Sequence, residues 1–131
     1  MKKLKKKDIL YPELSYRIIG AAFDVYNILG AGYHEKYYQR ALAQEFEKRS
    51  LSYGEQVPYK IQYKSNKDLG INYLDFLIED KIIVEIKKGN HFSKRHIDQV
   101  LNYLKTTGKK LAIIINFGTN EVSFKRIINI Y

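Results

Sequence analysis

Two acidic residues and a lysine in the middle of the chain have the types and spacing that could hold and use a cation. Asp75, Glu85 and Lys87 lie within a stretch rich in apolar residues, Asn72–Lys88, whose two halves meet at a polar run at 79–81. Ile, Val, Leu, Phe and Tyr dominate both halves of this stretch, and such residues favour β-strands. Two apolar runs joined by a short polar segment predict a β-hairpin.

The hydrophobic pattern also predicts how the two strands pair. A three-residue loop pairs Ile78 with Ile82 and sets Asp75 opposite Glu85. One face of the hairpin then carries only apolar side chains, namely Leu74, Phe76, Ile78, Ile82, Val84 and Ile86. A shift by one residue would mix apolar and polar side chains on both faces and would separate the two acids.

Directly opposed acids place their Cβ atoms roughly 4.5 to 5.5 Å apart, which is unfavourable unless a positive charge lies between them. Mg²⁺ prefers oxygen ligands and keeps several waters, so it suits two carboxylates on a half-open sheet face. Lys87 would lie roughly 6.5 to 7 Å from Glu85 along the strand. The alternative is a solvated face with an ordinary Glu and Lys. Three large residues on that face favour a covered site: Tyr73, Leu77 and Ile83.

Three motifs in the chain resemble those of one nuclease superfamily. Asp75, followed after nine residues by Glu85-Ile86-Lys87, resembles the signature of the PD-(D/E)xK nucleases, with Leu74 in place of the usual Pro. The segment Gly32–Tyr38 resembles the motif of the small GxxExxY proteins, through Gly32, Glu35 and Tyr38. The segment Gln99–Tyr103 resembles the QxxxY motif of exonuclease-like members.

The resemblance implies a catalytic set and a Mg²⁺ or Mn²⁺ cofactor. The catalytic set would be Asp75, Glu85, Lys87, Glu35 and Gln99, and the metal ligands would be Asp75, Glu85, Glu35 and the backbone carbonyl of Ile86. Lys87 would orient the attacking water or stabilise charge on the phosphate. Glu35 could instead only stabilise its helix, through a favourable interaction with the helix dipole. Gln99 could instead belong to an exposed polar helix face together with His96 and Tyr103.

The charge of the chain favours a polyanionic partner. Its 131 residues include 23 Lys and Arg against 14 Asp and Glu, which gives a net charge of +9. Five lysines lie in residues 1–10, which we expect to form a flexible basic tail, and the net charge is still +4 when these five charges are left out. We expect nucleic acid, DNA before RNA, to contact Lys88, Lys94, Arg95, His96, Tyr38 and Tyr103. A polar loop that enters a helix is the alternative reading of the basic cluster.

Composition excludes several other classes of protein. Residues 11–131 suit one domain by length, and the absence of Cys excludes disulfides and thiolate metal sites. The three histidines lack zinc spacing, and the chain has no glycine-rich phosphate loop. No apolar run approaches the 18 or so residues of a membrane span, and the basic start lacks the apolar stretch of a signal peptide. We therefore expect a cytoplasmic protein, free of membranes, with a homodimer or a protein partner possible.

Periodicity predicts an α/β domain with the element order ααβββαββ. Helices are expected at 12–29, 33–49 and 93–105, and strands at 55–63, 72–78, 82–88, 111–117 and 121–128, with a polar turn at 65–70. The strand–helix–strand unit from Ile82 to Phe117 should be a right-handed crossover between parallel strands. Together with the resemblance, this predicts a restriction-endonuclease-like core, a mixed sheet of four or five strands flanked by helices.

These observations lead to one principal hypothesis and two alternatives. The principal one is a metal-dependent nuclease that hydrolyses phosphodiester bonds of DNA, with RNA as the second choice. The first alternative is a non-catalytic nucleic-acid-binding module that retains the nuclease fold. The second is a component that acts only within an assembly with a partner.

Overall fold

The computed structural model describes residues 10–64 and 67–131. Apart from Leu10, the expected basic tail lies outside the described residues, as do Ser65 and Asn66 of the expected polar turn. The predicted element order is confirmed. The helices are α2 (Pro12–Leu29), α3 (Glu35–Lys48) and α4 (Lys94–Thr107), and the strands are β1 (Tyr53–Tyr63), β2 (Lys67–Ile78), β3 (Ile82–Lys88), β4 (Leu111–Phe117) and β5 (Val122–Ile128).

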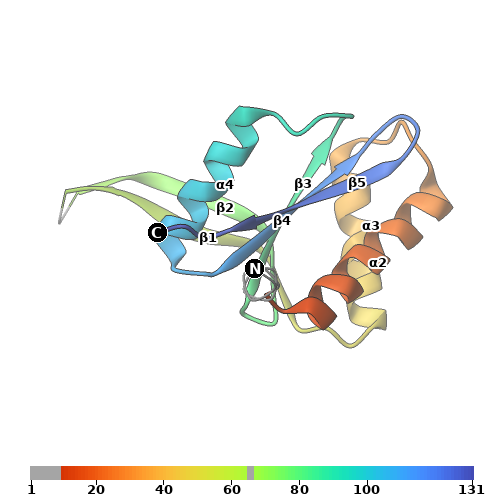
Figure 1. Ribbon diagram of the computed structural model, residues 1–131, viewed down its shortest axis with the longest axis horizontal. Coiled ribbons are helices and arrows are strands. Elements are labelled where there is room, and N and C mark those ends of the chain that lie inside the picture. Colours follow the sequence, from red (N-terminus) through yellow and green to blue (C-terminus); the bar gives the residue numbers. More distant parts are fainter. Residues whose placement is uncertain (1–9, 65–66) are drawn as a thin grey trace, which may run out of the picture.

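The five strands form one mixed sheet in the order β1-β2-β3-β4-β5, which confirms the predicted fold class. β3 and β4 are parallel, as expected for strands joined through α4, and the other neighbours are antiparallel. Helices α2 and α3 lie on one side of the sheet and α4 lies on the other, while β1 and β2 extend past the sheet as a two-stranded ribbon (Figure 1). We refer to this extension as the β1–β2 ribbon.

Local signals in the sequence fix most helix ends. Pro12 opens α2, and Gly30, with a φ of 73°, closes it by donating its N–H to the carbonyl of Tyr26. The Ser93 hydroxyl accepts the N–H of His96 at the start of α4, and Gly108 ends that helix with a φ of 75°. Helix α3 begins two residues later than predicted, because His34 has an extended backbone and caps the helix.

Strand β2 begins at Lys67, five residues before the predicted start at Asn72. The ladder with β1 continues to the pair Tyr63 and Lys67, so residues 67–70 of the predicted turn belong to a strand. These residues are exposed in the ribbon. Without a buried face they need not alternate between polar and apolar types, and the hydrophobic pattern therefore missed them.

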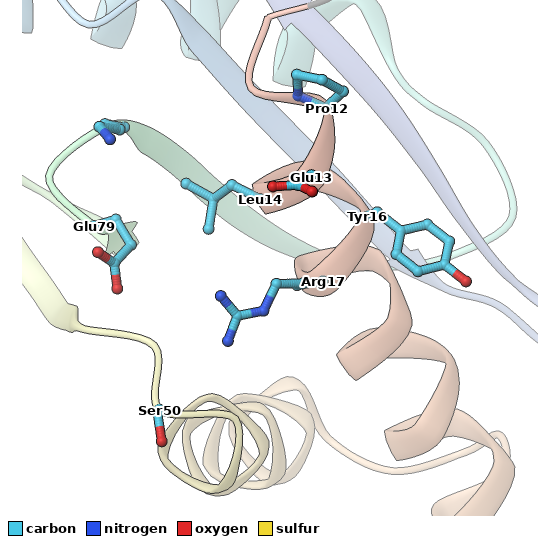
Figure 2. Close-up of a pocket in the computed structure, with 8 residues that line it drawn as sticks. Pro12, Glu13, Leu14, Tyr16, Arg17, Ser50 and Glu79 are labelled. Atoms are coloured by element: carbon cyan, nitrogen blue, oxygen red, sulfur yellow. The ribbon is translucent and has the colours of Figure 1, made fainter.

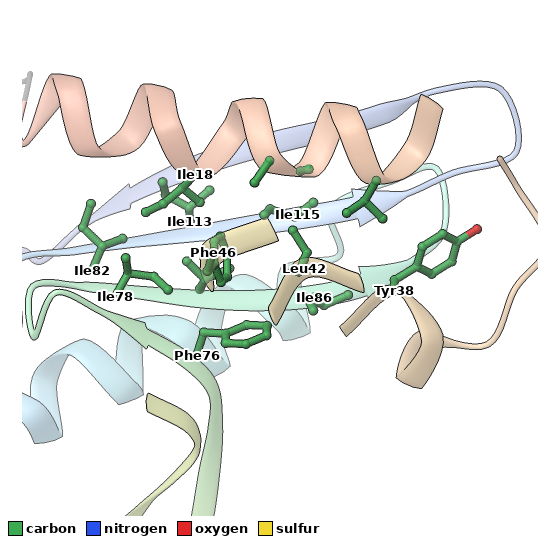
Figure 3. Packing of buried hydrophobic residues seen from close by; sticks show 14 of the residues in the cluster. Ile18, Tyr38, Leu42, Phe46, Phe76, Ile78, Ile82, Ile86, Ile113 and Ile115 are labelled. Atoms are coloured by element: carbon green, nitrogen blue, oxygen red, sulfur yellow. The ribbon is translucent and has the colours of Figure 1, made fainter. Parts of the chain in front are cut away.

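The main core fills the space between the sheet and helices α2 and α3 (Figure 3). Phe46 of α3 is fully buried and packs edge-on against Phe76 of β2, with ring centroids 5.1 Å apart. A second cluster lies between the sheet and α4 and contains Ile83, Val100, Leu104 and Ile114. Leu74 belongs to this second cluster, and its predicted place beside Phe76 on the first face is wrong.

No helix in the described part of the chain is long and apolar enough to cross a membrane.

Replacing Phe46 by Ala should lower the free energy of unfolding by about 3 to 5 kcal/mol, because the substitution leaves a cavity in a fully buried aromatic cluster. Urea unfolding followed by circular dichroism would measure the change. Phe23→Ala is the matched control, since Phe23 is 43% exposed on α2 and should lose less than about 1 kcal/mol. Equal losses for the two variants would contradict the assignment of the core.

Candidate active site

Strands β2 and β3 pair over only three residues and then separate. The pairs Ile78–Ile82, Leu77–Ile83 and Phe76–Val84 confirm the predicted register. Beyond Phe76, β2 pairs only with β1, while β3 continues beside β4 to its end at Lys88. The predicted backbone pairs of Asp75 with Glu85 and of Leu74 with Ile86 are therefore wrong. We call this point of separation the fork.

Two hydrogen bonds from side chains replace the missing backbone ladder at the fork. The backbone N–H of Asp75 donates to Glu85 Oε2, and the backbone N–H of Ile86 donates to Asp75 Oδ2, both at 2.8 Å. Each acid thus binds the backbone of the opposite strand. The two carboxylates are held together as predicted, although by a different arrangement from the one expected.

Burial and mutual repulsion make this pair of acids costly to ionise. Glu85 is only 3% exposed, and Asp75 is half-buried. Burial and the neighbouring charge of Asp75 raise the pKa of Glu85 to about 8. Burial likewise raises the pKa of Asp75, against the hydrogen bond from Ile86, which lowers it. A cation beside the pair would favour the ionised form of both.

Lys87 lies two residues after Glu85 in β3, and its charge lowers the pKa of both acids. Alternation along the strand sets Lys87 and Glu85 on the same side as Ile83, which packs under α4. Lys87 also lines a hollow with Gln99, His96 and Arg95 of α4. The structure therefore brings together the predicted residues of the hairpin and of the third helix.

Glu35 reaches the same end of β3 from the opposite layer. It is the first residue of α3, and its Oε2 accepts the backbone N–H of Lys88 at 3.2 Å. Its charge raises the pKa of both Asp75 and Glu85, so it lies within electrostatic range of the pair. Among the described residues, however, no three His, Cys, Asp or Glu side chains form a group that could hold a metal ion.

The donor set nevertheless fits a hard cation. Asp75 and Glu85 offer oxygen atoms from two adjacent strands, and such oxygens are the ligands that Mg²⁺ and Mn²⁺ prefer. One oxygen of each acid is held by a backbone N–H, while Glu85 Oε1 accepts no hydrogen bond from the described residues. The repulsion between two buried carboxylates also requires a positive charge if both are to ionise.

Gln56 of β1 belongs to the site, and sequence reasoning missed it. It has a φ of 50°, a value that is uncommon for a residue other than Gly, and it interrupts the β1–β2 ladder opposite Asp75. Its side-chain amide donates to Asp75 Oδ1 at 3.4 Å and to Gln39 Oε1 of α3 at 3.2 Å. A glutamine within a strand carries no sequence signal for such a role.

The residues predicted to bind nucleic acid divide into two groups. Lys88, Lys94 and Arg95 are exposed and His96 is half-buried, all at the end of β3 or the start of α4. Lys94 pairs with Asp98 at 2.8 Å. Burial, together with the charges of Lys87 and Arg95, lowers the pKa of His96.

The two tyrosines of the predicted nucleic-acid surface lie in the core instead. Tyr38 is 1% exposed, stacks on Phe117 with ring centroids 4.2 Å apart and donates its hydroxyl to the carbonyl of Gly30. Tyr103 is 3% exposed and packs against Tyr59 of β1. Both rings are enclosed because the helix faces that carry them pack on the sheet and on the ribbon.

A larger hollow lies away from these residues. It has a volume of about 770 Å³ and lies between the start of α2 and the β2–β3 turn, with Glu13, Arg17 and Glu79 around it (Figure 2). Glu79 follows the end of β2 at Ile78, and Ile78 is three residues from Asp75, a separation of about 10 Å along the strand. Because this hollow does not contain the paired acids, we place the candidate site at the fork.

Most of the folded region matches a known family. Residues 12–127 match the profile of the PD-(D/E)XK nuclease superfamily. The chain belongs to this superfamily. Members of the PD-(D/E)XK superfamily are usually nucleases and typically use divalent cations such as Mg²⁺ or Mn²⁺.

One solved structure is similar to this chain at the level of the fold. A solved structure titled "Crystal structure of SSO0001" is similar with a TM-score of 0.54 and 15% sequence identity. The similarity covers 72% of this chain and 49% of that one, so this PD-(D/E)XK chain spans about half the length of the solved structure. No curated protein is significantly similar in sequence.

The raised pKa of Glu85 predicts a stability that falls as pH rises. Because the folded chain binds this proton more tightly than the unfolded chain does, the free energy of unfolding should decrease between pH 4.5, near the ordinary pKa of Glu, and about pH 8. His96, whose pKa is lowered, acts in the opposite direction. Urea unfolding without metal, at several pH values in this window, would compare wild type with Glu85→Gln.

Glu85→Gln should remove most of the decrease in the free energy of unfolding with rising pH that is due to the acid pair. Glu13→Gln, on the outer surface of α2, is the matched control and should keep the wild-type slope. A Glu85→Gln slope equal to that of wild type would contradict the proposed burial of a strained carboxylate.

Proposed function

We propose that this protein is a metal-dependent nuclease that hydrolyses phosphodiester bonds of DNA. The observation that carries the proposal is the fork, where two acids from separate strands share a buried place beside a lysine. Superfamily membership supports hydrolysis of nucleic acid as the reaction class. The net charge of +9 supports a polyanionic substrate.

Asp75, Glu85 and the backbone carbonyl of Ile86 would hold Mg²⁺ or Mn²⁺, with Glu35 completing or tuning the site. Such a cation polarises a phosphoryl oxygen and lowers the pKa of a bound water. Lys87 would hold the attacking water or stabilise the negative charge that develops on the phosphate, which suits a mobile point charge. Gln99 lines the same hollow as Lys87 and would hold either the attacking water or the Lys87 side chain.

The loop before α3 supports a finer assignment to the GxxExxY group, which we include in the proposal. Gly32 has a φ of 94°, a conformation that favours glycine. Glu35 then binds the end of β3 through Lys88, and Tyr38 anchors the loop in the core through Gly30. Each residue of the motif thus helps to position Glu35 near the fork.

Mg²⁺ or Mn²⁺ should bind wild-type protein and should not bind Asp75→Asn, because that variant removes one of the two negative charges at the fork. Isothermal titration calorimetry would measure both. Asp80→Asn, in the turn of the same hairpin and 83% exposed at its side chain, is the matched control and should bind like wild type. The metal assignment would be wrong if wild type binds neither ion, alone or with inorganic phosphate present.

Lys87→Ala and Asp75→Asn should lower the rate of DNA cleavage by at least about 100-fold, because the first removes a positive charge beside the reacting phosphate and the second removes a ligand of the metal. Their fold and their DNA binding in EDTA should persist. Gel assays with single-stranded and duplex DNA would measure cleavage, and Lys81→Ala, in the distal turn, should cleave like wild type. Undiminished cleavage by Lys87→Ala would refute the site. Binding by wild type without cleavage would instead favour a non-catalytic module.

A further inference from the structure

A groove along α4 leads away from the fork. One hollow of about 520 Å³ includes Lys87 and Arg95, and a second of about 510 Å³ lies between α4 and the β1–β2 ribbon. The two share Gln99 and Asn102 in their linings, so they adjoin each other and together follow α4 as a groove. We call it the α4 groove.

The floor of the α4 groove is built from packed aromatic side chains. Tyr59 of β1 and Tyr103 of α4 meet edge to face with ring centroids 4.9 Å apart. The side-chain amide of Asn72 on β2 donates to the Tyr59 hydroxyl at 3.1 Å. These contacts join the ribbon to the helix, so the groove is present before any ligand binds.

The walls of the groove combine free amides with positive charge. The side-chain amides of Gln99 and Asn102 make no hydrogen bond with any described residue. Lys60 lies on the ribbon side of the groove and Lys105 on the helix side. Amide side chains offer both a donor and an acceptor, as the edges of nucleic-acid bases do, and lysines attract phosphates as point charges.

The shape of the groove favours a strand whose bases are unpaired. Duplex DNA is read by helices or ribbons that project into its grooves, whereas these amides line a hollow. A hollow can accept a base only when the base is free of its partner and its edge is exposed. Asn72 lies three residues from Asp75, about 10 Å along β2, so a strand in the groove would run directly to the acids.

We propose that the α4 groove binds an unpaired strand of DNA and delivers it to the fork, so that the substrate is single-stranded DNA or a single-stranded end. The inference rests on the proposed function and defines its substrate class. The amides of Gln99 and Asn102 contact base edges, and Lys60 and Lys105 contact phosphates.

Fluorescence anisotropy in EDTA would test the groove independently of cleavage. A labelled single strand should bind wild type at least about tenfold more tightly than the blunt duplex of the same sequence, at near-physiological salt. The double variant Gln99→Ala/Asn102→Ala should lose about tenfold in affinity for the single strand. Asn27→Ala, an exposed amide on α2, is the matched control and should bind like wild type.

An abasic strand of equal length separates base contacts from phosphate contacts. It should bind weakly, and its affinity should be the same for wild type and the double variant. The groove proposal is overturned if the duplex binds as tightly as the single strand, or if the folded double variant binds the single strand like wild type. Circular dichroism would establish that the variant is folded.

Cleavage assays with Mn²⁺ distinguish failure of the groove proposal from failure of the proposed nuclease function. Loss of single-strand binding in the double variant, without cleavage by wild type, would support the groove and refute the nuclease. Cleavage by wild type, with unchanged binding by the double variant, would refute the groove alone.

Discussion

The structure depends on two reciprocal hydrogen bonds at the fork between β2 and β3. An antiparallel pair would normally continue its backbone ladder, and each strand would lose hydrogen bonds where the ladder stops. Here the carboxylates of Asp75 and Glu85 accept the N–H groups of the opposite strands. The strands can therefore separate without leaving these buried donors unpaired, and the separation holds two acids side by side.

Beyond the fork, the two strands pair with different neighbours. β3 remains in the centre of the sheet beside β4, between the two hydrophobic clusters, and so gives Glu85 a fixed and buried place. β2 leaves with β1 and forms the ribbon that packs against α4 through Tyr59 and Tyr103. The same division thus produces the acid pair and the groove beside it.

The layers around the sheet bring further polar groups to the fork from both sides. Helix α3 supplies Glu35, which is held at the end of β3 while Tyr38 anchors the preceding loop in the core. Helix α4 supplies Gln99 and the basic residues near Lys87. Acidic groups lie at the centre of the site and cations around it, an arrangement that suits a bound cation in contact with a polyanion.

Much of this protein was determined by local patterns in its sequence. The helix at 12–29, the helix predicted at 93–105 and observed at 94–107, the strand Leu111–Phe117 and the three-residue loop after Ile78 follow from periodicity, caps and turn residues, as does the element order. These signals act over a few neighbouring residues. The motif around Asp75 and Glu85 likewise indicated the two acids and the superfamily.

Tertiary structure alone decided where the ladder ends. The pattern extended the β2–β3 pairing through Asp75, but packing of β2 with β1 and α4 separates the strands and moves Leu74 to the second cluster. Contacts distant in sequence also buried Tyr38 and Tyr103 and placed Gln56 against Asp75. These contacts depend on which helix or strand packs against each side chain in the folded protein. The periodicity of one segment holds no information about its packing partners.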